Sequence, residues 1–369
     1  MPAKKKQDIT YKSYLGLESL LQSQHPISMT AANAPAHDEM MFIVVHQTYE
    51  LWFKLVLFEI ERVQKILGQK SVKDADMRLV SASLGRSVAI MRLLVGQLDI
   101  METMTPLDFL DFRHVFRSAS GFQSLQFREL EMRLGLKKET RACYSGKSYD
   151  DFLPAEDRGH LQKLQKKPSL LEQLDSWLSR TPFVEMTGFS FWQAYRKAVG
   201  DMIAGDRKTI HADKRMNANA RDAEINKLKG MEEQFDLLFD AGKAGEMPWR
   251  FSQKALQAAL FINLYRDQPA LQIPFRILND LMDLDELLAL WRYRHALMAQ
   301  RMLGMKMGSG GSSGHDYLMQ TIGKHRIFSD LFALSTFFIP RSKLPQLPPH
   351  VESRMGFKYW DDTGVKKPK

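Results

Sequence analysis

The chain has 369 residues, of which 44% are hydrophobic and 26% are charged, a balance typical of a globular protein with a large core in one or two domains. Its longest purely apolar runs, such as Met40–Val45, are too short to span a bilayer, so we expect no membrane association. The net charge of +9 comes from lysines and arginines spread over many segments, without zinc-ligand spacing or an RNA-binding pattern, and therefore does not favour nucleic-acid binding.

The single cysteine and the N-terminal sequence favour a cytoplasmic protein. Cys143 has no second cysteine with which to form an internal disulfide, which fits a reducing compartment. The segment MPAKKKQD is basic but is not followed by the apolar run of a secretory signal. We therefore expect cytoplasmic localisation.

Helical periodicity dominates the chain, while the strict alternation typical of strands is scarce. Glycine and proline positions give the expected helix ends. In chain order the elements predicted before residue 137 are an N-terminal arm and linker (1–37, with a short helix within 8–24), a long helix (38–67), a second long helix (74–104) and a third helical segment that begins at Pro106, breaks at 118–121 and resumes to 136.

The middle of the chain, residues 137–250, differs in composition. It contains most of the charge runs, such as LQKLQKKP and RDAEINKLKGMEEQ, so we expect exposed helices and loops inserted between two halves of a core. Two segments, WLSRTP and GFSFWQAYRKAV, are apolar enough to pack back on that core. The core pattern returns at Ser252, whereas the proline-rich, basic tail (345–369) is expected to be loose. The sequence therefore predicts one all-α domain over 1–369, a helical bundle with an elaborated, charged helical insertion.

One histidine, His295, lies on the apolar face of a strongly helical segment. A neutral imidazole that points from a helix into an apolar pocket is a suitable axial ligand for haem iron. On spacing alone, a core histidine with a satisfied hydrogen bond is the simpler interpretation. The other residues of this apolar stripe are Leu284, Leu287, Leu288, Trp291, Met298 and Met302.

A second histidine, His46, lies on the buried stripe of the first long helix. Desolvation among aromatic side chains disfavours the charged form, so we expect a neutral ring that hydrogen-bonds through one nitrogen. A structural core histidine is the alternative. His46 and Glu50, four residues apart, could be two metal ligands, but nothing nearby completes such a set. The stripe also contains Phe42, Val45, Tyr49, Trp52, Phe53, Val56 and Ile60.

Two further segments could contact a ligand. Phe109 and Arg113 lie four residues apart and therefore share a helix face. A guanidinium beside an aromatic ring can bind a carboxylate with two hydrogen bonds, although on spacing alone a surface arginine paired with a local acid is simpler. The loop GSGGSSG (308–314) lacks the Lys-Ser/Thr ending of a phosphate-binding loop. Because it follows the His295 helix, it could cover one face of a bound cofactor.

Together these segments resemble the tryptophan 2,3-dioxygenase family of haem enzymes. The resemblance covers residues from about 8 to 342 in the family's order, and the charged middle is similar to the longer, animal-type members. The matching segments are YKSYLGLESLLQSQHPIS, HDEMMFIVVHQTYELWFK, METMTPLDFLDFRHVF with ASGFQSLQFRELE, KALQAALFINLYRDQP, and WRYRHALMAQRMLGMKMGSGGSSG with LFALSTFFIPR.

The resemblance implies an enzyme that holds haem b with ferrous iron and uses O2 as co-substrate. It would cleave the indole C2–C3 bond of L-tryptophan to give N-formyl-L-kynurenine, the first step of tryptophan catabolism through kynurenine. The family is a homotetramer. The alternative within the family is a member that monooxygenates a tryptophan analogue in secondary metabolism. A haem-binding sensor and a purely structural helical protein are the alternatives outside this enzyme class.

The resemblance also implies roles for the residues of the pocket. His295 matches the proximal ligand of the haem iron, and His46 matches the distal histidine that hydrogen-bonds the indole N–H. Arg113 matches the arginine that binds the substrate carboxylate. Phe42 and Phe109 match positions in the pocket wall, where some members have tyrosine in place of Phe109.

Two peripheral segments complete the implied site. Ser120 and Gly121 match the distal loop beside the haem. Tyr11, Tyr14 and Leu15 match an N-terminal arm that closes the substrate pocket of a neighbouring subunit in the family.

One position departs from the family's pattern. The loop usually reads GTGGSSG, so Ser309 stands where a threonine contacts the substrate ammonium group. Serine keeps the hydroxyl but lacks the methyl group that restricts the threonine rotamer. We expect weaker ordering of the substrate and room for a slightly different amino acid.

Overall fold

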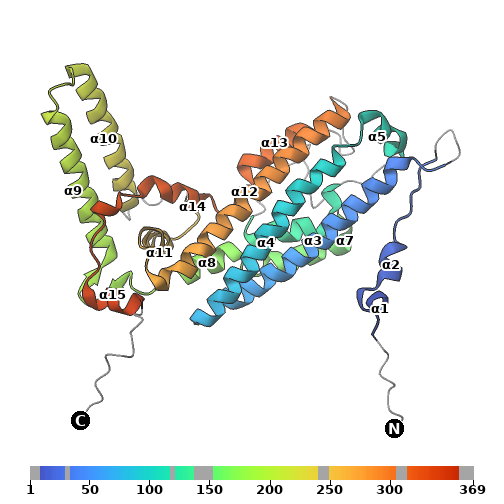
Figure 1. Ribbon diagram of the computed structural model, residues 1–369, viewed down its shortest axis with the longest axis horizontal. Coiled ribbons are helices and arrows are strands. Elements are labelled where there is room, and N and C mark those ends of the chain that lie inside the picture. The colour runs from blue at the N-terminus through green and yellow to red at the C-terminus, as the bar shows by residue number, and fades with distance from the viewer. Residues whose placement is uncertain are drawn as a thin grey trace, which may run out of the picture.

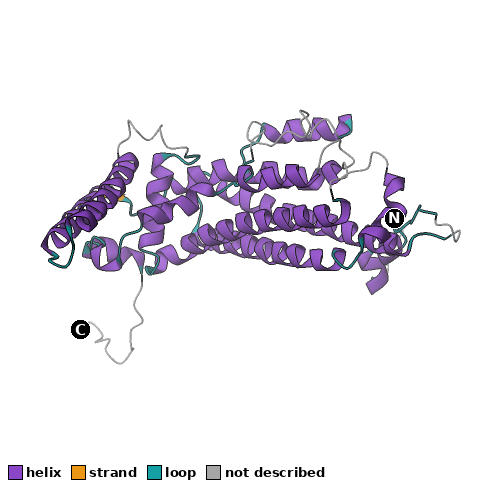
Figure 2. Cartoon of the chain, turned by 90° about the horizontal axis from the view of Figure 1, so that it is seen from above, coloured by secondary structure: helices purple, strands orange, loops and turns teal. Residues whose placement is uncertain are grey.

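The computed structural model describes residues 9–29, 34–116, 121–136, 153–239, 249–304 and 314–356. Within these ranges the only strands are β1 (Glu185–Met186) and β2 (Phe189–Ser190), which pair as a short antiparallel hairpin. The other elements are helices, as Figure 2 shows. The predicted all-α fold is confirmed.

A bundle of helices forms the body of the molecule (Figure 1). The second helix of the bundle, α4, lies between α3 and α12, and α13 packs on α12. A shorter helix, α6, packs against α3. The bounds of these helices are α3 (His37–Leu67), α4 (Asp74–Met101), α6 (Leu125–Leu134), α12 (Pro269–Leu303) and α13 (Gly314–Lys324).

The two long helices of the first half begin and end close to the predicted positions. Helix α3 buries side chains at helical spacing and ends at Gly68. Helix α4 ends at Met101, three residues earlier than predicted, because Glu102–Met104 form turns with the carbonyls just before them. Thr105 then caps the next helix with a reciprocal pair of hydrogen bonds to Asp108.

The third helical segment breaks over a longer stretch than the predicted 118–121. Its pieces are α5 (Pro106–Arg113), η1 (His114–Phe116), η2 (Gly121–Gln123) and α6. Helix α6 ends at Gly135, which has a φ of 125°. A Cβ atom there would lie 2.7 Å from the Cβ atom of Leu171, so glycine is required for the close approach of the chain to α8.

The charged middle of the chain is only partly exposed. Helices α9 and α10 form a hairpin that projects from one end of the molecule (Figure 1). In contrast, Leu174, Leu178, Phe191 and Tyr195 are fully buried in the main core, which confirms that WLSRTP and GFSFWQAYRKAV pack back. The helices of this region are α7 (Ala155–Gln165), α8 (Leu170–Leu178), α9 (Phe191–Ala212) and α10 (Ala218–Phe239).

The expectation of a loose tail is wrong for residues 345–356. Val351 and Met355 are buried, because α15 packs on the start of α12, and the Tyr265 hydroxyl donates to the carbonyl of Pro345 at 2.6 Å. Residues 357–369 lie outside the described part of the chain. The remaining elements are α1 (Tyr11–Leu15), α2 (Leu17–Leu21), α11 (Gln253–Leu264), α14 (Ser329–Ala333), η6 (Leu334–Phe337), η7 (Arg341–Lys343) and α15 (Pro349–Met355).

Helices α3 and α4 are long and apolar enough to cross a membrane by length and composition alone. Uninterrupted apolar runs, which are short in this sequence, did not predict that two helices would meet this criterion. Both helices contribute to the hydrophobic core of the bundle, and core helices of soluble proteins meet the same criterion, so this is weak evidence for a membrane span.

A buried cluster of charges joins α6, α12 and the segment after α13. The Glu131 carboxylate accepts hydrogen bonds from Arg128 and Arg292, each at 2.8 Å, and His325 Nδ1 lies 3.4 Å from it. Burial alone would raise the pKa of Glu131, but the two guanidinium charges and His325 outweigh it and hold the pKa well below its ordinary value. Glu131 is therefore ionised and holds three segments together.

A second buried carboxylate, Asp285 on α12, fixes the same C-terminal segment. It accepts hydrogen bonds from the backbone amides of Ile327 and Phe328 at 2.9 and 3.3 Å, and from Arg326 Nε at 2.9 Å. The chain after α13 is thus attached to both α6 and α12.

A third carboxyl group, Asp280, gives a prediction of pH-dependent stability. Its Oδ2 atom is buried against Gly85 of α4 and has no hydrogen-bond partner among the residues that the structure describes. Burial together with the charge of Asp283 raises the pKa of Asp280 to about 6. The folded protein therefore binds a proton more tightly than the unfolded chain, so this group lowers stability as the pH rises from about 4 through about 6. We expect Asp280→Asn to raise the free energy of unfolding at pH 7.5 by about 1 kcal/mol, after allowance for solvent screening of a half-buried group.

The measurement is the thermal midpoint of both proteins at pH 4.5 and pH 7.5. The advantage of the variant should be fully present at the higher pH and fall to about a third of that value at the lower one, because Asp280 begins to ionise in the unfolded chain near pH 4. Equal midpoints at pH 7.5 would contradict the raised pKa.

Candidate functional site

Helices α3, α5 and α12 bring the main predicted residues into one region. His46 comes from α3, Phe109 and Arg113 come from α5, and His295 comes from α12. Helix α5 packs against both α3 and α12. Residues separated by about 250 positions in the sequence are therefore placed around one site.

The His46 ring has a defined orientation and a defined proton. Its Nδ1 atom lies 2.7 Å from the carbonyl oxygen of Phe42, and the ring centroid lies 4.0 Å from that of Phe42. Because a carbonyl can only accept, Nδ1 carries the proton and Nε2 is left as an acceptor. Part of the His46 side chain is exposed, but protein atoms surround the rest of the ring closely. The resulting desolvation lowers the pKa of His46. The Phe42 hydrogen bond and the Glu50 charge act in the opposite direction but are weaker. His46 is therefore neutral at pH 7.

Aromatic rings form a wall beside His46. The ring of Phe42 lies 6.0 Å from that of Phe109, 5.6 Å from that of Phe112 and 4.9 Å from that of Phe116. Phe112 is fully buried, and the other three rings are partly buried. Arg113 follows in the last turn of α5 and is also partly buried, so a cationic group borders an apolar wall.

The His295 ring is held in a low-dielectric environment. Burial, aided by the charge of a protonated His46, lowers the pKa of His295 to about 4. Its Nδ1 atom is buried and has no hydrogen-bond partner in the described part of the chain. The Trp291 ring lies 5.3 Å from it, one helical turn earlier. His295 is thus a neutral imidazole whose Nδ1 atom has no hydrogen-bond partner among the described residues. It lies near enough to His46 that a positive charge on His46 would disfavour one on His295.

This donor set suits a metal that brings its own ligands. No group of three His, Cys, Asp or Glu side chains within the described ranges could hold a bare metal ion. The iron of a haem needs only one axial protein ligand, since the porphyrin supplies four nitrogens. A single neutral histidine meets that requirement.

Of the other predicted residues that the structure describes, those of the N-terminal arm are not brought to this region. Tyr11 and Tyr14 are 77% and 76% exposed on α1, and Leu15 is also exposed, so the N-terminal arm does not bury them in its own subunit. Helices α1 and α2 lie beside the bundle (Figure 1). Gly121 is exposed at the start of η2. Ser120 and Ser309 lie outside the described residues.

Two wall residues, Phe112 and Phe116, were not predicted from the sequence. Their signal was present, because they follow Phe109 at spacings of three and seven residues, which repeat one helix face. The change from α5 to η1 at His114 separates Phe116 from that regular pattern.

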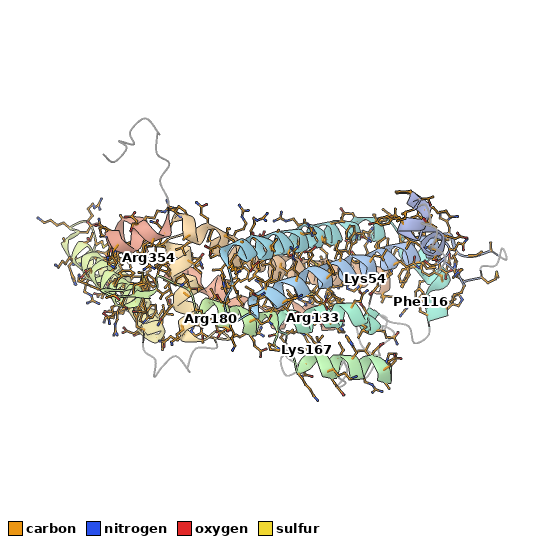
Figure 3. All side chains as sticks on the ribbon, turned by 90° about the horizontal axis from the view of Figure 1, so that it is seen from below. Lys54, Phe116, Arg133, Lys167, Arg180 and Arg354 are labelled. Atoms are coloured by element: carbon orange, nitrogen blue, oxygen red, sulfur yellow. The ribbon has the colours of Figure 1, made fainter. Side chains whose placement is uncertain are left out.

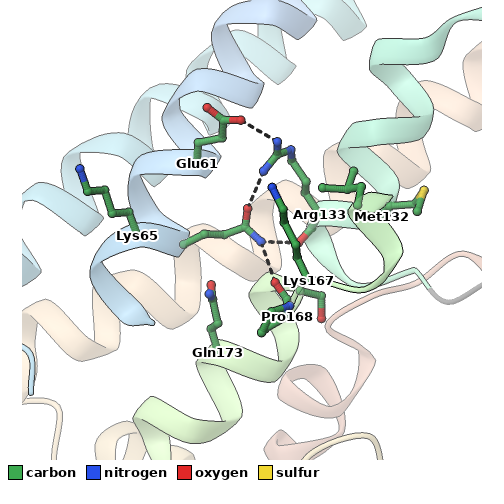
Figure 4. Close-up of a pocket in the computed structure, with 10 residues that line it drawn as sticks. Glu61, Lys65, Met132, Arg133, Lys167, Pro168 and Gln173 are labelled. Carbon is green, nitrogen blue, oxygen red and sulfur yellow. Dashed lines mark hydrogen bonds and ion pairs between the residues drawn. The ribbon is translucent and has the colours of Figure 1, made fainter. Parts of the chain in front are cut away.

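A cavity of about 300 Å³ lies elsewhere, between α3, α6, α7 and α8. Figure 3 shows Arg133 and Lys167 beside it, far along the bundle from Phe116. Gln64, one of the lining residues, donates to the carbonyls of Arg133 and Pro168, each at 3.3 Å, and Figure 4 labels these two partners. None of the predicted site residues lines this cavity. The lining residues are Glu61, Gln64, Lys65, Met132, Arg133, Leu164, Lys167, Pro168, Ser169 and Gln173.

Comparisons with known proteins match most of the chain. The family model described as tryptophan 2,3-dioxygenase matches residues 2–338. A tryptophan 2,3-dioxygenase of Bdellovibrio bacteriovorus is 46% identical over 95% of this chain and 99% of its own length. Proteins of the same name from Dictyostelium discoideum and Danio rerio (the latter form B) are 42% and 40% identical over 95% and 93% of this chain, and over 89% and 85% of their own lengths.

The geometry of His46 predicts its titration. Because its pKa is lowered from the ordinary value of 6.5, the ring should lose its charge below that pH as the pH rises. We expect diethyl pyrocarbonate, which modifies neutral imidazole, to label the His46 peptide with a half-maximal rate below pH 6.5, as followed by mass spectrometry. The exposed His25 on the N-terminal arm serves as the reference residue. A midpoint for His46 at or above pH 6.5 would contradict the neutral-acceptor assignment.

Proposed function

This chain belongs to the tryptophan 2,3-dioxygenase family, and we propose that it binds haem b and cleaves the indole C2–C3 bond of L-tryptophan with O2, giving N-formyl-L-kynurenine. The observation that carries this proposal is that α3 and α12 place two histidines with lowered pKa values, His46 and His295, in one region beside an aromatic wall. A haem iron, when bound, supplies the site at which dioxygen reacts, and the protein supplies orientation and electrostatics.

His295 would be the residue that holds the iron of a bound haem. Its lowered pKa keeps the ring unprotonated at physiological pH, and an unprotonated imidazole nitrogen is required for metal binding. Trp291 and the bundle helices restrict the ring, so the ligand is positioned before the cofactor binds.

His46 orients the substrate on the distal side. Since Nδ1 is occupied by the Phe42 carbonyl, Nε2 accepts a hydrogen bond from the indole N–H. An indole N–H is too weak an acid to be deprotonated readily by imidazole, so this contact aligns the ring and does not remove the proton. Phe42 and Phe109 pack against the indole and exclude water from it.

Arg113 binds the substrate carboxylate, and the Ser309 hydroxyl contacts its ammonium group. A guanidinium at the end of α5, beside the aromatic wall, suits an amino acid with one apolar end and one charged end. Together with the His46 contact, these interactions would fix the orientation of the indole ring and its C2–C3 bond in the site. Ser120 and Gly121 match the family's loop beside the haem and would add contacts to the bound cofactor.

The assembly is a cytoplasmic homotetramer that carries out the first step of tryptophan catabolism through kynurenine. The exposure of Tyr11, Tyr14 and Leu15 supports this proposal, because apolar side chains on a detached arm need a surface to cover them. In the tetramer the arm closes the substrate pocket of a neighbouring subunit. The monooxygenase alternative has no support from the three relatives, which all carry the dioxygenase name.

Labelled oxygen tests the reaction. The haem-loaded, reduced protein is mixed with L-tryptophan and ¹⁸O2, and the product is analysed by mass spectrometry. We expect a ring-opened product that contains two labelled atoms. One labelled atom with the ring intact would establish the monooxygenase alternative, and no product with any indole substrate would overturn the enzyme assignment. The His295→Ala variant is the control and should fail to retain haem.

A change at Arg113 tests the carboxylate contact. We expect Arg113→Ala to weaken binding of L-tryptophan by about 2–5 kcal/mol, the cost of removing one partner of a buried charge pair. The measurement compares kcat/KM for L-tryptophan and for tryptamine, which lacks the carboxylate. The loss should be specific to L-tryptophan. Equal effects on both substrates, or none on either, would exclude this role.

A further inference from the structure

A carboxylate close to His46, that of Glu50, is engaged with another helix. Glu50 lies one turn after His46 on α3 and is partly buried. Its Oε1 atom accepts from the Ser124 hydroxyl at 2.6 Å, and its Oε2 atom accepts from Gln126 Nε2 at 2.8 Å. The same Gln126 amide donates to the backbone carbonyl of Glu50 at 2.9 Å. No lysine or arginine in the described ranges forms an ion pair with Glu50, so its contacts are these donors from α6.

The two donors, Ser124 and Gln126, lie where the turn η2 ends and helix α6 begins. Ser124 is the N-cap of α6, and its hydroxyl oxygen accepts from the amide of Phe127 at 3.3 Å while it donates to Glu50. The preceding turn, η2, ends one residue before Ser124, whose amide donates to the carbonyl of Gly121 at 3.2 Å. A carboxylate at a helix N-terminus is also favoured by the helix dipole. Glu50 therefore fixes both the start of α6 and the turn that carries Gly121.

A side chain in the first turn of α6, Phe127, also packs near the part of the site that contains His295. The Phe127 ring lies 5.0 Å from that of Trp291, and Trp291 lies 5.3 Å from His295. A displacement of the α6 start would therefore affect the turn at Gly121 and the packing around His295 together.

We propose that Glu50 is a positioning residue: it holds the turn 121–124 and the start of α6 against the helix that carries His46, and so fixes the spacing between the two sides of the site. This inference rests on the proposed function for its consequence in catalysis. Its structural part, the attachment of α6 to α3 by Glu50, stands independently.

Glu61 provides a matched control on the same helix. It also joins α3 to α6, through Arg133 Nη2 at 2.6 Å, but it lies about three turns further along α3 and away from His46. The test compares Glu50→Gln and Glu50→Ala with Glu61→Gln and Glu61→Ala in the full-length, haem-loaded protein. If Glu50→Ala fails to fold, Glu50→Gln carries the test, because its amide oxygen can replace one acceptor while the charge is lost.

The first readout is hydrogen–deuterium exchange of peptides that cover residues 121–128. We expect exchange to be faster by about tenfold in Glu50→Ala, as for the loss of hydrogen bonds to a charged group, and intermediate in Glu50→Gln. The Glu61 variants should leave these peptides unchanged. Unchanged exchange in the Glu50 variants, or an equal increase in the Glu61 variants, would overturn the proposal.

The second readout is the division between KM and kcat for L-tryptophan, together with cyanide affinity of the ferric haem as a probe of the distal side. We expect KM to rise and cyanide affinity to change, with a larger effect in Glu50→Ala than in Glu50→Gln. The Glu61 variants should behave like the parent protein. Faster exchange without either effect would overturn the positioning role. If the protein fails to oxidise tryptophan at all, exchange and cyanide binding still decide whether Glu50 fixes the site.

Discussion

The buried Glu131 carboxylate is the contact on which the arrangement of the helices depends. It forms ion pairs with both Arg128 and Arg292 and lies beside His325, and all four side chains are almost completely buried. Removal of one partner from such a cluster leaves an uncompensated charge in a low-dielectric interior, at a cost of about 3–5 kcal/mol. Because the partners come from α6, α12 and the chain after α13, the relative placement of these segments is fixed by charge as well as by packing.

This constraint reaches the site through α12. Arg292 lies next to Trp291 and three residues before His295, so the helix that supplies the proposed iron ligand is held in position and rotation close to that ligand. Asp285 attaches the same helix to the segment that follows α13. On the other side, Glu50 attaches α3 to α6 near His46. Both histidines are therefore carried by helices with specific polar attachments to α6.

The candidate site differs from the cavity between α3, α6, α7 and α8 in its chemistry. That cavity is lined by lysine, arginine and glutamine side chains, with Arg133 already engaged by Glu61 and Gln64. The His46–His295 region instead combines neutral imidazoles with phenylalanine rings, which suits an aromatic substrate and a porphyrin.

The sequence by itself determined the helical class, the bounds of α3 and the apolar stripes around His46 and His295, because helical periodicity and glycine stops are local properties. Tertiary structure decided which of the candidate residues meet, because His46 and His295 are far apart in the chain and periodicity gives a face but no partner. It also decided the role of Glu50, which spacing suggested only as a metal ligand and which binds Ser124 and Gln126. The buried α15 was missed for the same reason: the surface that covers Val351 and Met355 belongs to other segments, and a proline-rich, basic composition does not reveal it.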